Sequence, residues 1–271
     1  MSDLLFYLSQ PFVQHALLAA TIVAVTCGVL GPFVIVRGMA FAVHGTSELA
    51  FTGAAGGLLA GNNPIAGAFV GALVVAGLIG VLGNRERERD ATIGVILAFG
   101  LGLGILLLSF YHGFASEATN ILFGYIFGVS TTQLVMLGGV GLLALGALLC
   151  MYRPLLFTSV DPEVAAAKGI AVRRLGLLFV VILALTVTAA AQIVGTLLVL
   201  SLAITPAAAA SRWTVAPLKL TLLSVVFALI ASDGGLLLSL VFSSIKASVF
   251  ITGISFVMYL LSRIAARQYD R

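Results

Sequence analysis

Long apolar runs, separated by short polar breaks, constrain the fold of this chain more than any other feature of its sequence. A helix needs about 20 apolar residues to cross the roughly 30 Å hydrocarbon core of a bilayer. About nine runs approach this length: residues 12–36, 39–60, 64–83, 91–111, 130–151, 174–191, 193–211, 219–242 and 245–263. The sequence therefore predicts an all-α, polytopic membrane protein with about nine transmembrane helices in a single integral membrane domain, residues 1–271.

Two segments of the sequence leave the number of spans open between eight and nine. The polar break at Gln192 is short for an extracellular turn, and the segment ILFGYIFGV, residues 121–129, is only partly apolar and could be re-entrant. The class itself does not depend on this count. A content of 61% hydrophobic and 9% charged residues, with a mean hydropathy of +1.19, excludes a soluble domain.

The N-terminal residues MSDLLFYLSQPF contain no lysine or arginine, so they lack the basic region of a cleaved signal peptide. We expect the first span to remain in the mature protein. Cys27 and Cys150 both lie in apolar runs, where a free cysteine acts as a small hydrophobic residue, and their spacing matches no metal site.

The basic residues predict an orientation, because cytoplasmic loops of membrane proteins carry an excess of Lys and Arg. An extracellular N-terminus leaves only Lys246 outside and puts the C-terminus in the cytoplasm. The other basic residues then all lie inside: Arg37, Arg85, Arg87, Arg89, Arg153, Lys168, Arg173, Arg174, Arg212, Lys219, Arg263, Arg267 and Arg271. This topology, rather than binding to nucleic acid, explains the pI near 9.3.

A histidine and a glutamate interrupt the second apolar run, in the stretch MAFAVHGTSELAFTG, residues 39–53. His44 and Glu48 are four residues apart, so a helix places both on one face, one turn apart. An imidazole nitrogen and a carboxylate oxygen suit a divalent cation such as zinc or manganese. Ionisable residues inside a membrane mark a substrate path by default. The alternative is a His–Glu hydrogen bond that only holds two helices together.

Four further residues are weaker candidates for the path. Pro206 lies inside an apolar run and should kink or break its helix, either as a wall of the path or as a simple bend. Asp233, which two glycines follow, either lines the path or, as we favour, caps a half-helix. His15 and His112 lie near the outer face, where each either meets incoming metal or an extracytoplasmic partner or, as is more common, is an ordinary interfacial histidine.

The longest polar interruption, between the fifth and sixth runs, contains a short predicted helix over residues 162–168. Asp161 is a good N-cap and Pro162 suits the first helical position. Glu163 favours the positive end of the helix dipole, and Gly169 suits the position that follows the helix. A short cytoplasmic helix crosses no membrane, so it is either a loop stiffener or a docking surface for a partner.

The segment SVDPEVAAAKGI, residues 159–170, resembles the coupling-helix region of permease subunits of bacterial ATP-binding-cassette importers for zinc, manganese and related metals, the ABC-3 family. Four other blocks match in the family's order: CGVLGPFVIVRGMAF, RERDATIGVILAFGLGLG, ILFGYIFGVS and VGTLLVLSLAITPAAAAS. The resemblance covers roughly residues 13–240.

The resemblance implies a fold and a set of partners. The fold would be the importer permease fold of the metal and vitamin B12 type, in the bacterial plasma membrane, with a coupling helix at about residues 161–169. Two permease copies would associate, two cytoplasmic ATP-binding subunits would dock on the coupling helices, and an extracytoplasmic metal-binding protein would deliver zinc, manganese or iron.

Two segments depart from the family pattern. The family usually carries an aspartate followed four residues later by a histidine, which contact the ion in transit. His44 and Glu48 stand at those positions here, with Val43 in place of the usual glycine. The ligand types are kept in reverse order, so the resemblance still implies metal handling and leaves the metal open. Near the C-terminus, SSIKASVFITG replaces an Asp-x-Pro-x-Gly turn, and we assign no function there.

We therefore interpret the chain as a permease that carries a divalent metal inward and is not itself an enzyme. No GxxxxGK[ST] segment occurs, so ATP hydrolysis is expected in a separate subunit, and no permanently bound cofactor is expected. His44 and Glu48 from two protomers would offer the ion two imidazoles and two carboxylates. Two alternatives stay open: an ABC permease for a metal chelate such as a siderophore or cobalamin, and a stand-alone secondary metal transporter or channel in which this pair relays protons.

Overall fold

The computed structural model describes residues 9–61, 63–82, 86–111, 126–242 and 245–269, and every regular element within these ranges is a helix. The elements are α2 (Pro11–Val36), α3 (Ala40–Gly61), α4 (Pro64–Leu82), α5 (Glu86–Ser109), the 3₁₀ turn η1 (Ile126–Gly128), α7 (Thr131–Val160), α8 (Pro162–Ala167), α9 (Val172–Val194), α10 (Thr196–Ala210), α11 (Pro217–Val241) and α12 (Ala247–Tyr269). The predicted all-α class is confirmed for this part of the chain.

Seven helices among the described residues are long and apolar enough to cross a membrane: α2, α4, α5 from Asp90, α7, α9, α11 and α12. The other two long helices fall short for different reasons. α10 has only 15 residues. α3 has 22 residues, and its His44 and Glu48 reduce its apolar character. The polytopic class is confirmed, and the count of nine spans stays a prediction.

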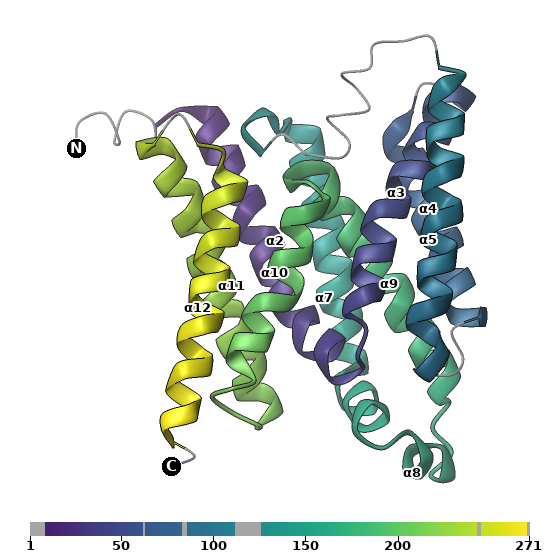
Figure 1. Cartoon of the computed structure of the whole chain (residues 1–271), viewed down its shortest axis with the longest axis vertical. Helices are drawn as coiled ribbons and strands as arrows, with labels where there is room; N and C mark the ends of the chain where they lie inside the picture. The colour runs from purple at the N-terminus through teal and green to yellow at the C-terminus, as the bar shows by residue number, and fades with distance from the viewer. Residues whose placement is uncertain (1–8, 62, 83–85, 112–125, 243–244, 270–271) are drawn as a thin grey trace.

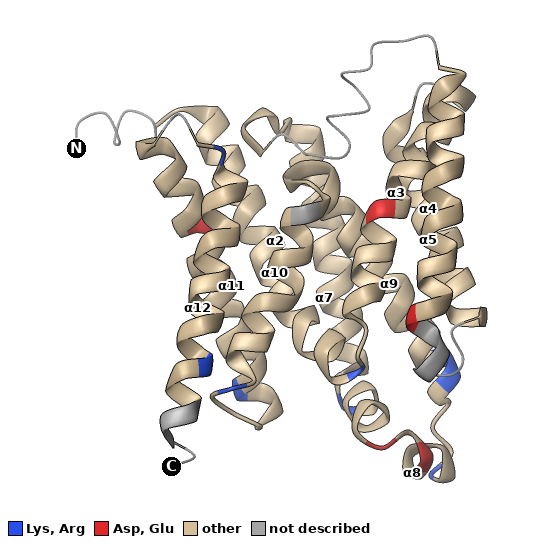
Figure 2. Cartoon of the chain, in the orientation of Figure 1, with Lys and Arg blue, Asp and Glu red and all other residues tan. Residues whose placement is uncertain are grey.

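The long helices run side by side along the long axis of the molecule (Figure 1). α2 begins at one end of the bundle. α12 ends at the opposite end, which is also the end that carries α8. α10 lies in the middle of the bundle, because it packs against α2, α3, α9, α11 and α12. Lys and Arg lie mostly at the end with α8 and the last turns of α12 (Figure 2).

Glycines on α3 and α4 bring these two helices into backbone contact. A Cβ atom on Gly53 would collide with the carbonyl oxygen of Gly67 and lie 2.8 Å from the Cα atom of Gly71. A Cβ on Gly57 would lie 2.9 Å from the Cα of Gly67. Lipid offers no hydrophobic driving force between helices, so close backbone packing of this kind is what holds transmembrane helices together.

Two helix ends differ from the sequence prediction. The fifth run was expected to end at about residue 151, but α7 continues through Pro154 to Val160, and Leu155 in the added turns is fully buried. The turn expected at Gln192 is also wrong, because α9 continues to Val194. The break falls at Gly195, whose φ of 91° and ψ of 153° only glycine adopts readily. A polar side chain does not end a helix, whereas this backbone conformation does.

The partly apolar segment 121–129 lies mostly outside the described residues. Its described part contains η1, a single 3₁₀ turn that packs against α2. His112 also lies outside the described residues, so its predicted role at the outer face is left as a prediction.

Candidate functional site

His44 and Glu48 lie one turn apart on α3, and both side chains are partly exposed. Neighbouring faces of α3 are filled by other helices. A Cβ on Gly45 would lie 2.8 Å from the Ile93 side chain of α5, and Gly53 contacts α4 as described above. At about 100° per residue, His44 and Glu48 point about 180° and about 140° away from Gly53, so they face away from α4, whereas Glu48 lies within about 60° of Gly45 and the α5 contact. Both side chains are partly exposed on this side of α3.

The local contacts of this pair leave its polar groups available. The backbone carbonyl of His44 accepts a hydrogen bond from the Ser47 hydroxyl at 2.9 Å, and the imidazole ring lies 6.0 Å from the Phe41 ring, centroid to centroid. Within the described part of the chain, no hydrogen bond or ion pair joins the side chains of His44 and Glu48. The simple helix-to-helix hydrogen bond that the alternative interpretation requires is therefore not seen there.

One chain supplies few metal ligands at this place. Among the described residues, no group of three or more His, Cys, Asp and Glu side chains gathers in a way that could hold a metal ion. A tetrahedral ion such as zinc takes four ligands in most protein sites. His44 and Glu48 thus form at most half of such a site.

Asp233 does not cap a half-helix, and that expectation is wrong. α11 continues without a break from Pro217 to Val241, through Asp233 and the two glycines that follow. The carboxylate instead accepts from the Thr21 hydroxyl of α2, at 3.3 Å to each oxygen. Gly235 allows α12 to approach, because a Cβ there would lie 2.6 Å from the Ile251 backbone nitrogen. The glycines thus serve helix packing rather than helix breaking.

Pro206 leaves α10 intact, since the helix extends from Thr196 to Ala210. Pro206 is buried, and its neighbour Thr205 lines an open groove of about 840 Å³ between α10 and α12. The hydroxyl-bearing residues of this groove are Ser201, Thr205, Ser248 and Thr252. Pro206 therefore lies beside a groove rather than on its wall.

His15 lies on the first turns of α2, away from His44 along the chain. Its Nδ1 atom lies 3.3 Å from the carbonyl oxygen of Val129, which follows η1. This contact links α2 to the segment before α7. It gives His15 a structural partner, and its predicted contact with incoming metal remains untested.

The short helix between α7 and α9 forms as its end signals predict. The Asp161 carboxylate accepts from the backbone N–H of Val164 at 2.9 Å, and Pro162 occupies the first turn of α8. Glu163 also lies in the first turn, where a negative charge favours the helix dipole. Gly169 follows the helix with a φ of +80°, in the left-handed region that favours glycine. The local geometry is confirmed, and its role in docking is a separate question.

Comparison with known proteins adds the family to this geometry. A family model described as the ABC 3 transport family matches residues 9–266. This chain belongs to the ABC 3 transport family. It is 34% identical over 247 residues to the manganese transport system membrane protein MntC of Halalkalibacterium halodurans, covering 89% of this chain and 85% of that protein. It is 28% identical over 225 residues to the high-affinity zinc uptake system membrane protein ZnuB of Haemophilus influenzae, covering 83% of this chain and 86% of that protein.

A solved structure shares the fold. The protein described as PsaBC from Streptococcus pneumoniae in complex with Fab is similar with a TM-score of 0.82 and 32% identity, covering 94% of this chain and 91% of that one. The helix arrangement described above therefore also occurs in that solved structure.

In this member of the ABC 3 transport family, Arg37 makes a set of contacts that the sequence analysis missed. Arg37 ends α2, and its guanidinium donates to the Ser159 and Thr158 hydroxyls at the end of α7, both at 2.7 Å. These partners are more than 120 residues away in the sequence. No local pattern identifies such a pair, so only the fold reveals it.

Proposed function

We propose that this chain is the membrane permease subunit of an ATP-binding-cassette importer that carries a divalent transition metal ion into the cytoplasm. The observation that carries the proposal is the match over nearly the whole chain to the ABC 3 transport family, together with relatives named for manganese and for zinc transport. The intramembrane pair His44 and Glu48 provides ligands of the type that both metals accept.

In this proposal the chain spans the membrane nine times, with an extracellular N-terminus and a cytoplasmic C-terminus. Two features support this topology. The start of α2 and the end of α12 lie at opposite ends of the bundle, which requires an odd number of crossings (Figure 1). Lys and Arg gather at the end with α8, as expected for the cytoplasmic side (Figure 2). α3 and α10 then count as spans beside the seven clearly apolar helices.

The ion is bound in transit by His44 and Glu48 from two copies of the chain. One copy supplies one imidazole and one carboxylate, and two copies supply the four ligands of a common metal coordination number. An extracytoplasmic metal-binding protein delivers the ion from outside. The site must release the ion inward, so its ligands cannot be closed around the metal as in a structural zinc site.

Energy comes from separate cytoplasmic ATP-binding subunits, and α8 is their docking helix. Three features support this role: α8 is short, is capped at both ends, and lies at the end of the bundle that carries most of the basic residues. Val164, 44% exposed, lies on its surface, and Ala165 is buried against the rest of the chain. One face of α8 is thus fixed to the permease, and the other is free to contact a partner.

The proposal is tested by uptake of radioactive manganese and zinc into vesicles that contain the chain, its ATP-binding subunit and its binding protein. We expect ATP-dependent uptake of one or both ions. His44→Ala and Glu48→Ala should each lower this uptake by about tenfold or more. Asp90→Ala is the matched control, since it removes an exposed ionisable side chain from a different helix and should leave uptake intact. Uptake that persists without ATP would favour a stand-alone transporter and overturn the proposal.

A further inference from the structure

Arg37 ties the cytoplasmic end of α2 to the last turns of α7 and the beginning of α9. Its Nε atom donates to the Ser159 hydroxyl and its Nη2 atom to the Thr158 hydroxyl, both at 2.7 Å. The same Nη2 atom lies 3.4 Å from the carbonyl oxygen of Leu155. The guanidinium carbon stands 5.3 Å from the centroid of the Phe179 ring of α9, a cation–π distance. One side chain therefore joins three helices.

The segment that Arg37 holds leads directly into α8. α7 ends at Val160, Asp161 is both the end of α7 and the N-cap of α8, and no linker separates the two helices. A force applied to α8 therefore acts first on the turn that contains Thr158 and Ser159.

Along the chain, Arg37 is followed within three residues by α3, the helix that carries the proposed ion site. The turn between α2 and α3 is fixed by two backbone hydrogen bonds, from Gly38 to Ile35 at 3.0 Å and from Met39 to Val34 at 2.8 Å. Gly38 has a φ of 59°, in the left-handed region. A helix end closed by these two backbone hydrogen bonds requires this conformation of the residue that follows it. α3 begins at Ala40, and His44 lies in its second turn. A displacement of Arg37 is thus passed to the start of α3 by a stiff connection.

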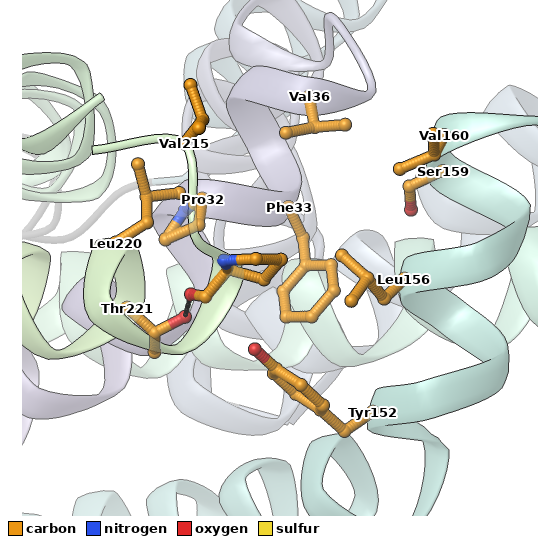
Figure 3. Close-up of a pocket in the computed structure, with 11 residues that line it drawn as sticks. Pro32, Phe33, Val36, Tyr152, Leu156, Ser159, Val160, Val215, Leu220 and Thr221 are labelled. Atoms are coloured by element: carbon orange, nitrogen blue, oxygen red, sulfur yellow. Dashed lines mark hydrogen bonds between the residues drawn. The ribbon is translucent and has the colours of Figure 1, made fainter. Parts of the chain in front are cut away.

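A cavity next to these hydrogen bonds leaves room for movement. It has a volume of about 110 Å³ and is lined by α2, α7 and the start of α11. Figure 3 shows Ser159, Val160 and Leu156 of α7 on one side and Leu220 and Thr221 of α11 on the other. The end of α7 is therefore not packed against α11 at this point. The buried Leu155 packs this end of α7, and the hydrogen bonds to Arg37 attach it a second time, beside the cavity.

We propose that Arg37 is a positioning residue that transmits movement of α8 to α3 and so links the ATP-binding subunits to the His44–Glu48 site. The inference rests on the proposed function. It follows from the combination of three observations: strong directional bonds to the end of α7, a stiff turn into α3, and a cavity that gives the α7 segment freedom. Arg37 does not contact the ion.

The experiment uses the complete complex of permease, ATP-binding subunit and binding protein in vesicles. Three quantities are measured: basal ATP hydrolysis, its stimulation by metal-loaded binding protein, and metal uptake. Coupling between sites typically corresponds to an effect of about 5- to 150-fold. Arg37→Gln should therefore lower stimulated hydrolysis and uptake by about fivefold or more while basal hydrolysis stays within about twofold of wild type. Arg153→Gln, an exposed arginine on α7, is the matched control and should behave as wild type.

A second variant keeps the test decisive if Arg37→Gln fails to insert. The double variant Thr158→Val with Ser159→Ala removes the two hydroxyls that accept from Arg37, together with their own bonds to the Leu155 carbonyl within α7, and should reproduce the loss of stimulation. Combining it with Arg37→Gln should lower stimulation and uptake little further, because the effects of substitutions within one hydrogen-bond network do not add. Arg37→Lys should restore part of the coupling, since lysine keeps the charge but not the two-pronged donor geometry.

The outcomes separate this inference from the proposed function. If wild-type vesicles take up no metal with ATP, the proposed function itself fails. If wild type transports and the hydroxyl double variant keeps full stimulation and uptake, Arg37 is only an anchor of the fold and the inference is overturned. Additive effects of the two sets of substitutions would also overturn it, because they would place Arg37 and the α7 hydroxyls in separate roles.

Discussion

The Thr21 hydroxyl of α2 lies 3.3 Å from each carboxylate oxygen of Asp233 on α11. The buried hydroxyl of the preceding residue, Ser232, donates to the carbonyl oxygen of Ala20 at 3.2 Å. Two adjacent residues of α11 thus bond to two adjacent residues of α2, although 212 residues separate them in the sequence. This pair of contacts joins two apolar helices where lipid offers no polar partner, and the role of Asp233 in lining the path stays a prediction.

The first prediction concerns this contact. Thr21→Val should lower the melting temperature of the detergent-solubilised chain by about 2–4 °C, because one interhelical hydrogen bond is worth about 0.6–1 kcal/mol. Asp233→Asn keeps an acceptor and should cost less than Asp233→Leu. Thr252→Val removes a hydroxyl from the open groove between α10 and α12 and serves as the control. Additive losses in Thr21→Val and Asp233→Leu would mean that the two side chains do not interact.

The second prediction concerns the contact between α3 and α4. Gly71→Ala places a methyl group 2.7 Å from the Cα atom of Gly53, so the helices must separate. We expect a loss of about 1–3 kcal/mol, the usual cost of overpacking, seen as a lower melting temperature. Gly77→Ala on the same helix meets nothing within 4 Å and is the matched control. Equal melting temperatures for the two variants would show that α3 and α4 are not in backbone contact.

The short helix α8 shows what the sequence predicts well. Its start and end depend on Asp161, Pro162 and Gly169, and each acts on atoms within three residues of itself. Helix capping is a local interaction, so its residues can be recognised in the sequence without knowledge of the fold. The apolar runs are predictable for a similar reason, because the thickness of the bilayer sets their length.

Contacts between distant segments were not predictable in the same way. The partners of Arg37 and Asp233 depend on which helices become neighbours, and one sequence carries no information on that choice. The break near Gln192 was misplaced because polarity was used as the sign of a turn, whereas the backbone conformation of Gly195 sets the end of α9. The extent of α7 was missed because the apolar run ends at about residue 151, whereas the buried Leu155 keeps the helix packed beyond Pro154.

The third prediction tests α8 as the docking helix. Glu163→Arg reverses a charge in the first turn of α8 and should weaken binding of the ATP-binding subunit, because it opposes the helix dipole and alters the exposed surface. Co-purification of the two subunits and stimulated ATP hydrolysis are measured together. Asp90→Arg makes the same charge change at an exposed residue of α5 and is the control. Unchanged co-purification and hydrolysis would leave α8 as a loop stiffener.

The fourth prediction concerns topology. Thr131 at the start of α7 and Val164 of α8 are both exposed and lie at opposite ends of α7 along the chain. In a background without Cys27 and Cys150, a single cysteine at Thr131 should react with a membrane-impermeant thiol reagent in intact cells. A single cysteine at Val164 should react only after the membrane is permeabilised. The reverse pattern would invert the proposed orientation, and equal labelling in intact cells would exclude a single fixed one.

The last prediction concerns the order of the two proposed ligands. The family usually has a carboxylate followed by an imidazole, whereas this chain has His44 followed by Glu48, four residues apart on one face of α3. Exchange of the two groups, in the double variant His44→Asp with Glu48→His, keeps both ligand types and their spacing. If the pair binds the ion, the double variant should take up more metal than either His44→Ala or Glu48→Ala. Each alanine variant should take up metal about tenfold or more slowly than wild type, equivalent to about 1.4 kcal/mol of ion binding.

Uptake of manganese and of zinc is measured separately, because a carboxylate moved along the helix changes the ligand geometry and with it the preference between the two metals. An exchanged variant as inactive as the alanine variants, in protein that still stimulates its ATP-binding subunit, would mean that the positions hold these residues for packing and not for the ion.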